Sequence, residues 1–93
     1  MTHTARLLVM DILTRLETTV TARLSADPGS SYVASLAVRG LPTIARKFGE
    51  EATEAVVAAL SGSDEELAGE AADVLFHLTV LLAAKGIPLA QIM

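Results

Sequence analysis

The sequence predicts an all-α fold, an antiparallel helical bundle, and three observations support this prediction. Hydrophobic residues make up 52% of the 93 residues and aromatic residues only 3%, and the frequent Ala and Leu favour helix. Apolar residues recur at intervals of three and four, as on one face of a helix, and no stretch alternates convincingly as a β-strand does. Short turn signals separate the helical stretches, and helices joined by short connections pack antiparallel. We expect one domain over residues 1–93.

The first expected helix covers about residues 1–26 and carries one apolar stripe. A turn signal, Asp-Pro-Gly-Ser, follows at residues 27–30. Ser30 or Ser31 can then cap a short helix that ends at Gly40. The stripe of the first helix consists of Leu7, Leu8, Leu13, Leu16, Val20 and Leu24.

A helical hairpin is expected in the second half of the chain. Its two helices cover about residues 41–60 and 64–85, and Ser-Gly-Ser at 61–63 forms the turn between them. Ser63, with Glu66 three residues later, has the spacing of a capping box. The short turn makes the two helices antiparallel neighbours.

Charge and composition exclude several classes of function. The net charge is −4, and without a basic run a nucleic-acid partner is not expected. The absence of cysteine excludes disulfides and thiolate metal sites. The first ten residues have no secretory layout, and the most apolar segment, residues 74–84, is interrupted by His77 and too short to span a bilayer. We therefore expect a cytoplasmic protein with no membrane partner.

The size and aliphatic content of the chain favour self-association. A chain of 93 residues buries a modest fraction of its surface and is marginal alone. So much aliphatic surface is more easily covered when a second subunit packs against it. We expect a homodimer or a higher homo-oligomer.

Four acidic residues form the strongest chemical pattern. Glu51-x-x-Glu54 is followed, fifteen residues later, by Glu70-x-x-Asp73; we call these four residues the carboxylate quartet. Residues three apart share a helix face, and each pair lies about equally far from the hairpin turn, so the two pairs can meet. Glu51 falls in the middle of an apolar stripe, where an uncompensated charge is costly. Four converging carboxylates suit a hard divalent cation such as Mg²⁺, which retains water and binds phosphates.

Less specific interpretations of the same residues stay open. The acids could form a solvated face paired with Arg46 and Lys47. His77 could be a partner of a carboxylate, or a core histidine whose hydrogen bonds are satisfied. Lys47 could hold a phosphate or balance the charge of Glu51, one helical turn away.

Several motifs together resemble the phosphoribosyl-ATP pyrophosphohydrolase family, within the all-α, MazG-type nucleotide pyrophosphohydrolases. The similarity covers about residues 7–93. The Glu-Glu-x-x-Glu and Glu-x-x-Asp pieces indicate only the superfamily, whereas the Ser-Tyr segment and the run that ends in His77 indicate the histidine-pathway enzyme. The matching pieces are Ser31-Tyr32-x-x-x-Leu36, Gly40-Leu41, Lys47-Phe48-Gly49-Glu50-Glu51-Ala52-x-Glu54, Glu65-Glu66-Leu67 and Glu70-Ala71-Ala72-Asp73-Val74-Leu75-Phe76-His77-Leu78.

The resemblance implies the second step of histidine biosynthesis. Phosphoribosyl-ATP would be hydrolysed between its α- and β-phosphates to phosphoribosyl-AMP and pyrophosphate. The resemblance also implies a MazG-like bundle completed by homo-oligomerisation, usually as a dimer, and Mg²⁺ as the cofactor, for which Mn²⁺ can substitute.

Most of the expected site residues follow from the same resemblance; Arg39 and Arg46 are added as cations for the phosphates, and Arg46 stands where many relatives have a neutral residue. The carboxylate quartet would hold the metal, and Glu50 would be a further ligand or would orient water. A spare carboxylate, Glu50 or Glu51, would accept a proton from water, and cationic side chains would stabilise the phosphates. The expected catalytic residues are Glu50, Glu51 and Lys47, and the expected substrate-binding residues are Ser31, Tyr32, Arg39, Arg46, Lys47 and His77.

Two other functions remain possible from the sequence. A housekeeping pyrophosphohydrolase would use the same metal site on another nucleoside triphosphate. A helical dimerisation module without enzymatic activity would carry the acids only as surface charge.

Overall fold

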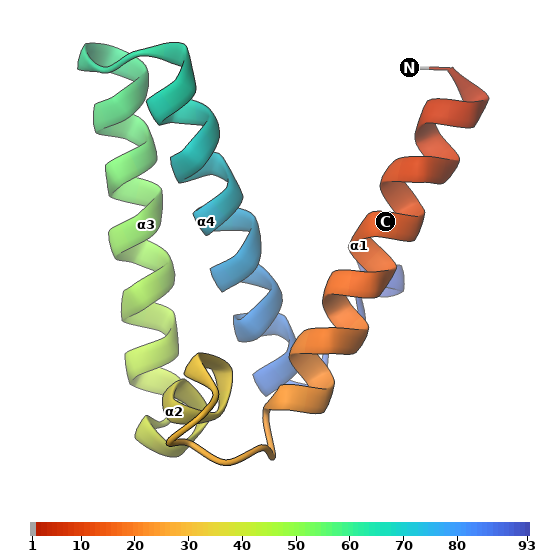
Figure 1. Cartoon of the computed structure of the whole chain (residues 1–93), viewed down its shortest axis with the longest axis vertical. Helices are drawn as coiled ribbons and strands as arrows, with labels where there is room; N and C mark the ends of the chain where they lie inside the picture. Colours follow the sequence, from red (N-terminus) through yellow and green to blue (C-terminus); the bar gives the residue numbers. More distant parts are fainter. Residues whose placement is uncertain (1) are drawn as a thin grey trace.

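The computed structural model describes residues 2–93 and confirms the all-α prediction. Within these residues there is no β-strand, and the elements follow one another through short connections (Figure 1). They are α1 (His3–Arg23), α2 (Tyr32–Arg39), α3 (Leu41–Ser61), α4 (Asp64–Ala84) and the short 3-10 helix η1 (Leu89–Gln91). The start of the first predicted helix, Met1, lies outside the described residues.

Helix α1 ends three residues before the predicted Ala26. Its last residue is Arg23, whose carbonyl accepts from the Ala26 N–H at 3.1 Å, so the chain turns there. The side chain of Asp27 then accepts from the Gly29 N–H at 3.1 Å. This aspartate turn competes with a further helical turn and ends α1 early.

Helices α3 and α4 form the predicted hairpin, and they stand side by side along their length (Figure 1). Ser63 caps α4, because its Oγ accepts from the Glu66 N–H at 3.1 Å. The reciprocal bond of the expected capping box joins Ser63 Oγ to Glu66 Oε1 at 3.3 Å instead of reaching the Ser63 N–H. A Cβ on Gly62 would lie 3.0 Å from the Ala58 carbonyl oxygen, so the backbone crowds any larger residue at this position of the turn.

The hydrophobic core lies at the end of the hairpin away from its turn. There the second half of α1, all of α2, the start of α3 and the end of α4 meet (Figure 1). The Glu17 carboxylate of α1 also accepts from the Leu89 N–H at 2.6 Å, which ties the C-terminal segment to α1. The core consists of Val20, Val33, Leu36, Ile44 and Val80.

The first half of α1 diverges from the hairpin and packs against none of it (Figure 1). Leu7 and Leu8, which extend the predicted stripe of this helix, are 56% and 60% exposed. The stripe is buried within the chain only from about Leu16 to Leu24. A large apolar surface is therefore left uncovered by the chain itself.

Helix α4 is, within the described residues, the one helix long and apolar enough to cross a membrane, with a mean hydropathy of 1.5. The sequence prediction considered only residues 74–84 and found them too short. Length and composition alone are weak support for a membrane span, because core helices pass the same test. Helix α4 carries acidic residues in its first turn and a buried His77 in its second half.

Candidate functional site

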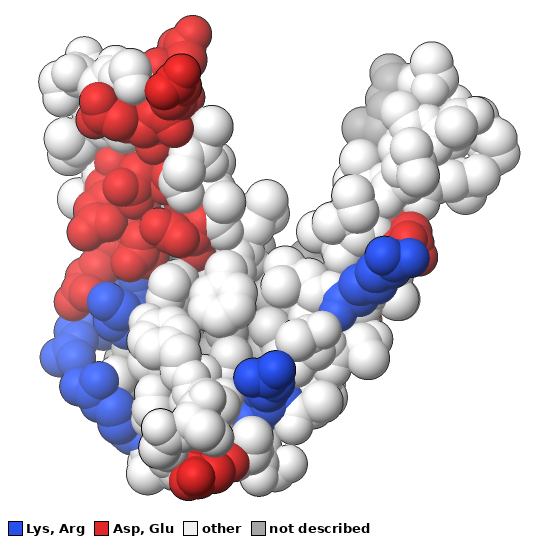
Figure 2. Space-filling view, in the orientation of Figure 1, with Lys and Arg blue, Asp and Glu red and all other residues white. Residues whose placement is uncertain are grey.

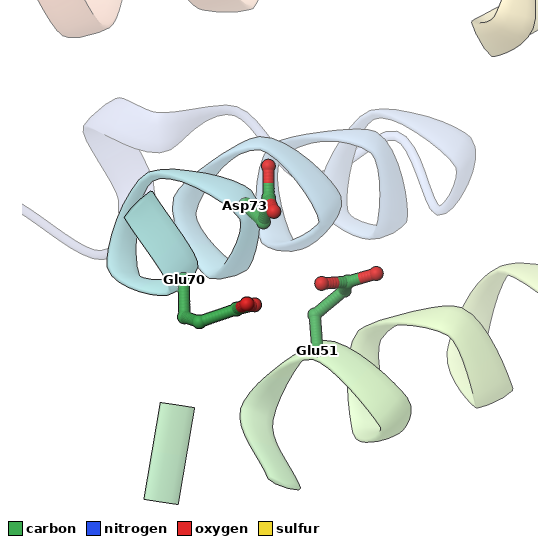
Figure 3. A group of neighbouring side chains, drawn as sticks. All are labelled: Glu51, Glu70 and Asp73. Carbon is green, nitrogen blue, oxygen red and sulfur yellow. The ribbon is translucent and has the colours of Figure 1, made fainter. Parts of the chain in front are cut away.

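Three carboxylates from the two arms of the hairpin point at one another (Figure 3). Glu51 comes from α3, and Glu70 and Asp73 come from α4, one helical turn apart. One oxygen from each lies within 4.8 Å of the others. Glu51 is only 9% exposed, as its place in the apolar stripe predicts. The hairpin geometry inferred from the spacing is thus present for three of the four predicted ligands.

Glu54, the fourth member of the carboxylate quartet, lies beside this group. Burial raises the pKa of Glu51, and a hydrogen bond with Glu54 and the charge of Glu54 raise it further. The same causes, in the same order, raise the pKa of Glu70. Like charges close together disfavour ionisation of one another, and Glu54 acts in this way on both Glu51 and Glu70.

The quartet fits a hard divalent cation. The Glu70 Oε2 atom is buried and has no hydrogen-bond partner among the described residues. A buried polar atom without a partner costs free energy, which a bound cation would offset. The atoms that the cluster offers to a metal are all carboxylate oxygens. Mg²⁺, Mn²⁺ and Ca²⁺ prefer such ligands.

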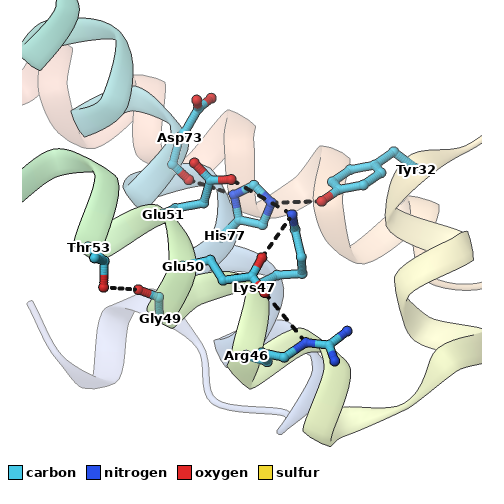
Figure 4. A network of polar contacts seen from close by, with 9 residues as sticks. All are labelled: Tyr32, Arg46, Lys47, Gly49, Glu50, Glu51, Thr53, Asp73 and His77. Atoms are coloured by element: carbon cyan, nitrogen blue, oxygen red, sulfur yellow. Dashed lines mark hydrogen bonds and ion pairs between the residues drawn. The ribbon is translucent and has the colours of Figure 1, made fainter. Parts of the chain in front are cut away.

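Positive charge is placed directly beside the quartet (Figure 4). Lys47 Nζ lies 3.3 Å from Glu50 Oε2 and 3.9 Å from Glu51 Oε1. Arg46 Nε lies 3.6 Å from Glu50 Oε1, so Glu50 pairs with both cations. On the surface, Asp and Glu side chains cover the turn-side half of the hairpin, and Lys and Arg side chains begin immediately below them, toward α2 (Figure 2).

His77 is buried and its two ring nitrogens are both satisfied. Nδ1 lies 2.7 Å from the main-chain oxygen of Asp73, and Nε2 lies 2.9 Å from the Tyr32 hydroxyl. The rings of Tyr32 and Phe76 stack at 6.1 Å, and both meet the His77 ring edge-on. Of the two interpretations of His77, the structure favours the satisfied buried histidine, because it bonds a main-chain oxygen and a hydroxyl instead of a carboxylate.

Two other predicted substrate-binding residues have different surroundings. The Ser31 side chain is buried, and its Oγ accepts from the Ala34 N–H at 3.2 Å, which caps α2. Arg39 is exposed in the last turn of α2, and within residues 2–93 it forms no ion pair. Neither side chain forms a hydrogen bond or ion pair with the four carboxylates within residues 2–93, so their roles toward substrate stay predictions.

A hollow of about 290 Å³ extends from the quartet toward the hairpin turn. Glu54 and Glu70 form one end of it, and Thr53, Ser61 and Glu66 contribute further polar groups. The sequence analysis did not assign these three residues to the site. Ser61 and Glu66 share helix faces with Glu54 and Glu70, at spacings of seven and four residues, whereas Thr53 directly precedes Glu54 and its spacing gives no such signal.

Comparison with known proteins gives a consistent result. A family model described as phosphoribosyl-ATP pyrophosphohydrolase matches residues 13–93. The phosphoribosyl-ATP pyrophosphatase of Erythrobacter litoralis is 62% identical over 84 residues, which cover 90% of this chain and 81% of the relative. That of Novosphingobium aromaticivorans is 55% identical over 83 residues, covering 89% and 78%. That of Rhizorhabdus wittichii is 54% identical over 81 residues, covering 87% and 76%.

Proposed function

Because the chain belongs to the phosphoribosyl-ATP pyrophosphohydrolase family, we propose that the carboxylate quartet is the site at which it performs that family's reaction. The protein is an enzyme that hydrolyses phosphoribosyl-ATP to phosphoribosyl-AMP and pyrophosphate in histidine biosynthesis. One observation supports this location of the active site: oxygens of Glu51, Glu70 and Asp73 lie within 4.8 Å of one another, and a buried Glu70 oxygen among them has no hydrogen-bond partner. No other group of at least three acids or histidines within residues 2–93 converges in this way.

The metal in this proposal is Mg²⁺, held by Glu51, Glu54, Glu70 and Asp73, with Mn²⁺ as a substitute. When bound, such a cation neutralises charge on the phosphate chain and activates water for attack. The protein contributes the oxygen donors and fixes them on two rigid helices. It also lowers the exposure of Glu51 to 9%, which strengthens its interaction with any cation.

Phosphate binding is assigned to the cationic side of the site. Lys47 lies against the quartet and presents an ammonium at its edge. Arg46 shares Glu50 with Lys47, so both cations can turn from Glu50 to phosphate oxygens when substrate arrives. Positive charge aimed at phosphate oxygens stabilises the charge that develops during phosphoryl cleavage.

Proton transfer from the attacking water is assigned to a carboxylate next to the ligands. The Glu50 side chain is about half exposed, and its carboxylate forms ion pairs with Arg46 and Lys47. If Arg46 and Lys47 turn to the phosphate oxygens of the substrate, Glu50 is left free to accept a proton. Glu51 is the second candidate, because its carboxylate lies within 4.8 Å of those of Glu70 and Asp73 and so borders the position of the attacking water in this proposal.

A panel of nucleotides tests the reaction. We expect pyrophosphate release from phosphoribosyl-ATP that requires Mg²⁺ and exceeds release from each of the common nucleoside triphosphates in kcat/KM. Faster release from another triphosphate would instead support the housekeeping alternative. The non-enzymatic dimerisation module is excluded by the family to which the chain belongs.

A second copy of the chain completes the proposal. Apolar side chains on α1 and on the hairpin are left exposed, including Leu8 at 60%, Ile12 at 63% and Leu60 at 84%. Many exposed large apolar side chains favour association with a partner, and symmetric homodimers are the commonest oligomers of soluble proteins. We place this dimer in the cytoplasm, as expected for a biosynthetic enzyme.

A further inference from the structure

Aromatic side chains are scarce in this chain, which has one Tyr, two Phe and no Trp, yet two of them lie together beside the carboxylate quartet. The rings of Tyr32 and Phe76 stack with centroids 6.1 Å apart, and the His77 ring meets both edge-on. We call these three residues the ring cluster. His77 Nδ1 lies 2.7 Å from the main-chain oxygen of Asp73, a member of the quartet. The ring cluster therefore adjoins the quartet, and its tyrosine belongs to α2.

Tyr32 is the exposed member of the ring cluster. It is 49% exposed, whereas His77 is buried and Phe76 is half-buried. Its hydroxyl is engaged with His77 Nε2 at 2.9 Å, and one face of its ring lies toward Phe76. The exposed area of the side chain therefore lies on the opposite face of the ring. Aromatic rings gain free energy by stacking, so this open face is available to a flat partner.

The open ring is held in place before any ligand binds. The first turn of α2 is fixed by two side chains: Ser31 Oγ accepts from the Ala34 N–H at 3.2 Å, and Ser35 Oγ donates to the Tyr32 carbonyl at 2.6 Å. At its other end the ring is fixed by the hydrogen bond with His77, whichever of the two groups donates the proton. A surface that is ordered in advance loses little freedom when it binds a ligand.

The chemistry of this face suits the base of a nucleotide. The face of an aromatic ring carries negative charge density, so it disfavours phosphate groups. A purine base is flat and aromatic, and it stacks on such a face whatever groups its edge carries. Only two hydrogen bonds and the width of the His77 ring separate the Tyr32 hydroxyl from the main chain of Asp73. A nucleotide is longer than this, so its base can reach Tyr32 while its phosphates lie at the quartet.

We propose that the purine base of the substrate stacks on the exposed face of Tyr32. In this arrangement the base lies beside α2, and the phosphate chain lies over the hairpin at the quartet. The inference rests on the proposed function, because it takes the quartet as the place where the phosphates bind. Tyr32 then strengthens the binding of the part of the substrate that carries the base and contributes nothing to the binding of pyrophosphate.

The two products of the reaction test this proposal, because phosphoribosyl-AMP keeps the base and pyrophosphate lacks it. Their inhibition constants are measured with Mg²⁺ for the wild type and two variants. Tyr32→Leu should raise the inhibition constant of phosphoribosyl-AMP about tenfold, the effect of losing one stack between a base and an aromatic ring. The constant of pyrophosphate should change by less than about twofold, the scatter of independent sites. Tyr32→Phe, the matched control, keeps the ring and should retain most of the affinity for phosphoribosyl-AMP.

The fluorescence of the wild-type protein gives a second measurement that needs no substitution. Tyr32 is the one tyrosine of the chain, and there is no tryptophan, so the intrinsic tyrosine emission reports on this ring alone. Phosphoribosyl-AMP with Mg²⁺ should quench the emission, whereas pyrophosphate with Mg²⁺ should leave it nearly unchanged. Equal responses to the two products would overturn the proposal.

Three results with the variants would also overturn it. An equal rise in both inhibition constants for Tyr32→Leu would mean that the ring supports the whole site. Unchanged constants would mean that the base binds elsewhere. A Tyr32→Phe variant as weak as Tyr32→Leu would assign the effect to the hydroxyl instead of the ring. Calorimetry should give all three proteins the same Mg²⁺ affinity, because the metal ligands are untouched. Failure of the proposed function would show in another protein, as wild-type turnover in Asp73→Asn.

Discussion

Glu51 on α3 and Glu70 on α4 face each other across the hairpin with carboxylate oxygens within 4.8 Å. They come from chain positions nineteen residues apart, and the turn at Gly62 brings them level. Two carboxylates at this separation repel each other, and both have pKa values raised by burial and by Glu54. Repulsion between these carboxylates therefore destabilises the cation-free protein, and a bound cation would offset it.

The metal-free protein should become more stable when one of these charges is removed. Glu70→Gln keeps the shape of the side chain and removes its repulsion with Glu51, Glu54 and Asp73. We expect a higher midpoint in a thermal melt without divalent cations. The matched control is Glu65→Gln in the first turn of α4, where the charge favours the helix N-terminus; its midpoint should fall slightly. A lower midpoint for Glu70→Gln would show that repulsion does not dominate at the cluster.

Magnesium should stabilise the wild-type protein in proportion to its affinity. A ligand that binds only the folded state adds about 2.7 kcal/mol at a hundred times its dissociation constant. We expect the melting midpoint to rise steadily with Mg²⁺ concentration in the wild type. Asp73→Asn should show little of this rise. Equal rises in both proteins would place the bound cation elsewhere.

Glu54 should be essential for turnover, although it lies outside the group formed by Glu51, Glu70 and Asp73. Glu54→Gln removes one proposed metal ligand and the negative charge that acts on Glu51 and Glu70. Loss of residues that merely support metal ligands costs about 10- to 100-fold, so we expect a fall in turnover of more than about 100-fold for a ligand. The helical circular dichroism signal should be unchanged, and Glu65→Gln should retain turnover. Normal turnover in Glu54→Gln would remove it from the site.

Two glycines of the hairpin should respond oppositely to alanine. A Cβ at Gly62 would lie 3.0 Å from the backbone oxygen of Ala58, whereas a Cβ at Gly69 meets no atom within 4 Å. Gly69→Ala should therefore stabilise the protein by up to about 1 kcal/mol through helix propensity. Gly62→Ala should destabilise it by about 1 kcal/mol or more, because the turn must open. Chemical denaturation of both variants measures the difference, and a stabilised Gly62→Ala would contradict the crowded turn.

A charge on the exposed apolar surface should break the homodimer. Leu60 is 84% exposed in the chain, so Leu60→Glu costs the isolated fold little but places a charge in an apolar interface. Light scattering should give twice the 9.7 kDa chain mass for the wild type and the single mass for the variant. Thr19→Glu, an added charge at an exposed polar position of α1, is the control and should stay dimeric. A monomeric wild type would contradict the dimer itself.

Much of the fold follows from local signals in the sequence. The hairpin, its turn and the cap at Ser63 were predictable because caps and glycines act over three or four residues. The end of α1 was predicted three residues late, because the Asp27 turn outweighs the propensity of Ala26 for helix. The exposure of Leu7 could not be predicted from periodicity, since an apolar stripe does not say whether its own chain or another covers it.

The site was predictable where it depends on helix spacing. Glu51, Glu70 and Asp73 converge because residues three apart share a face and the hairpin sets their depth. The bond between Tyr32 and His77 joins residues forty-five positions apart, and only the packing of α2 against α4 brings them together. The cap formed by Ser31 depends on residues only three positions apart, so the sequence could predict it. The relation of Ser31 to substrate depends on packing and stays a prediction.

Turnover and metal binding measured on the same proteins test the central claim most directly. The comparison uses the wild type, Asp73→Asn and the control Glu65→Gln, with Mg²⁺ affinity from calorimetry and kcat/KM for phosphoribosyl-ATP from pyrophosphate release. The quartet assignment predicts that Asp73→Asn loses Mg²⁺ affinity and turnover together, while Glu65→Gln keeps both. Hydrolysis by Asp73→Asn at the wild-type rate, or unchanged Mg²⁺ affinity in that variant, would contradict it.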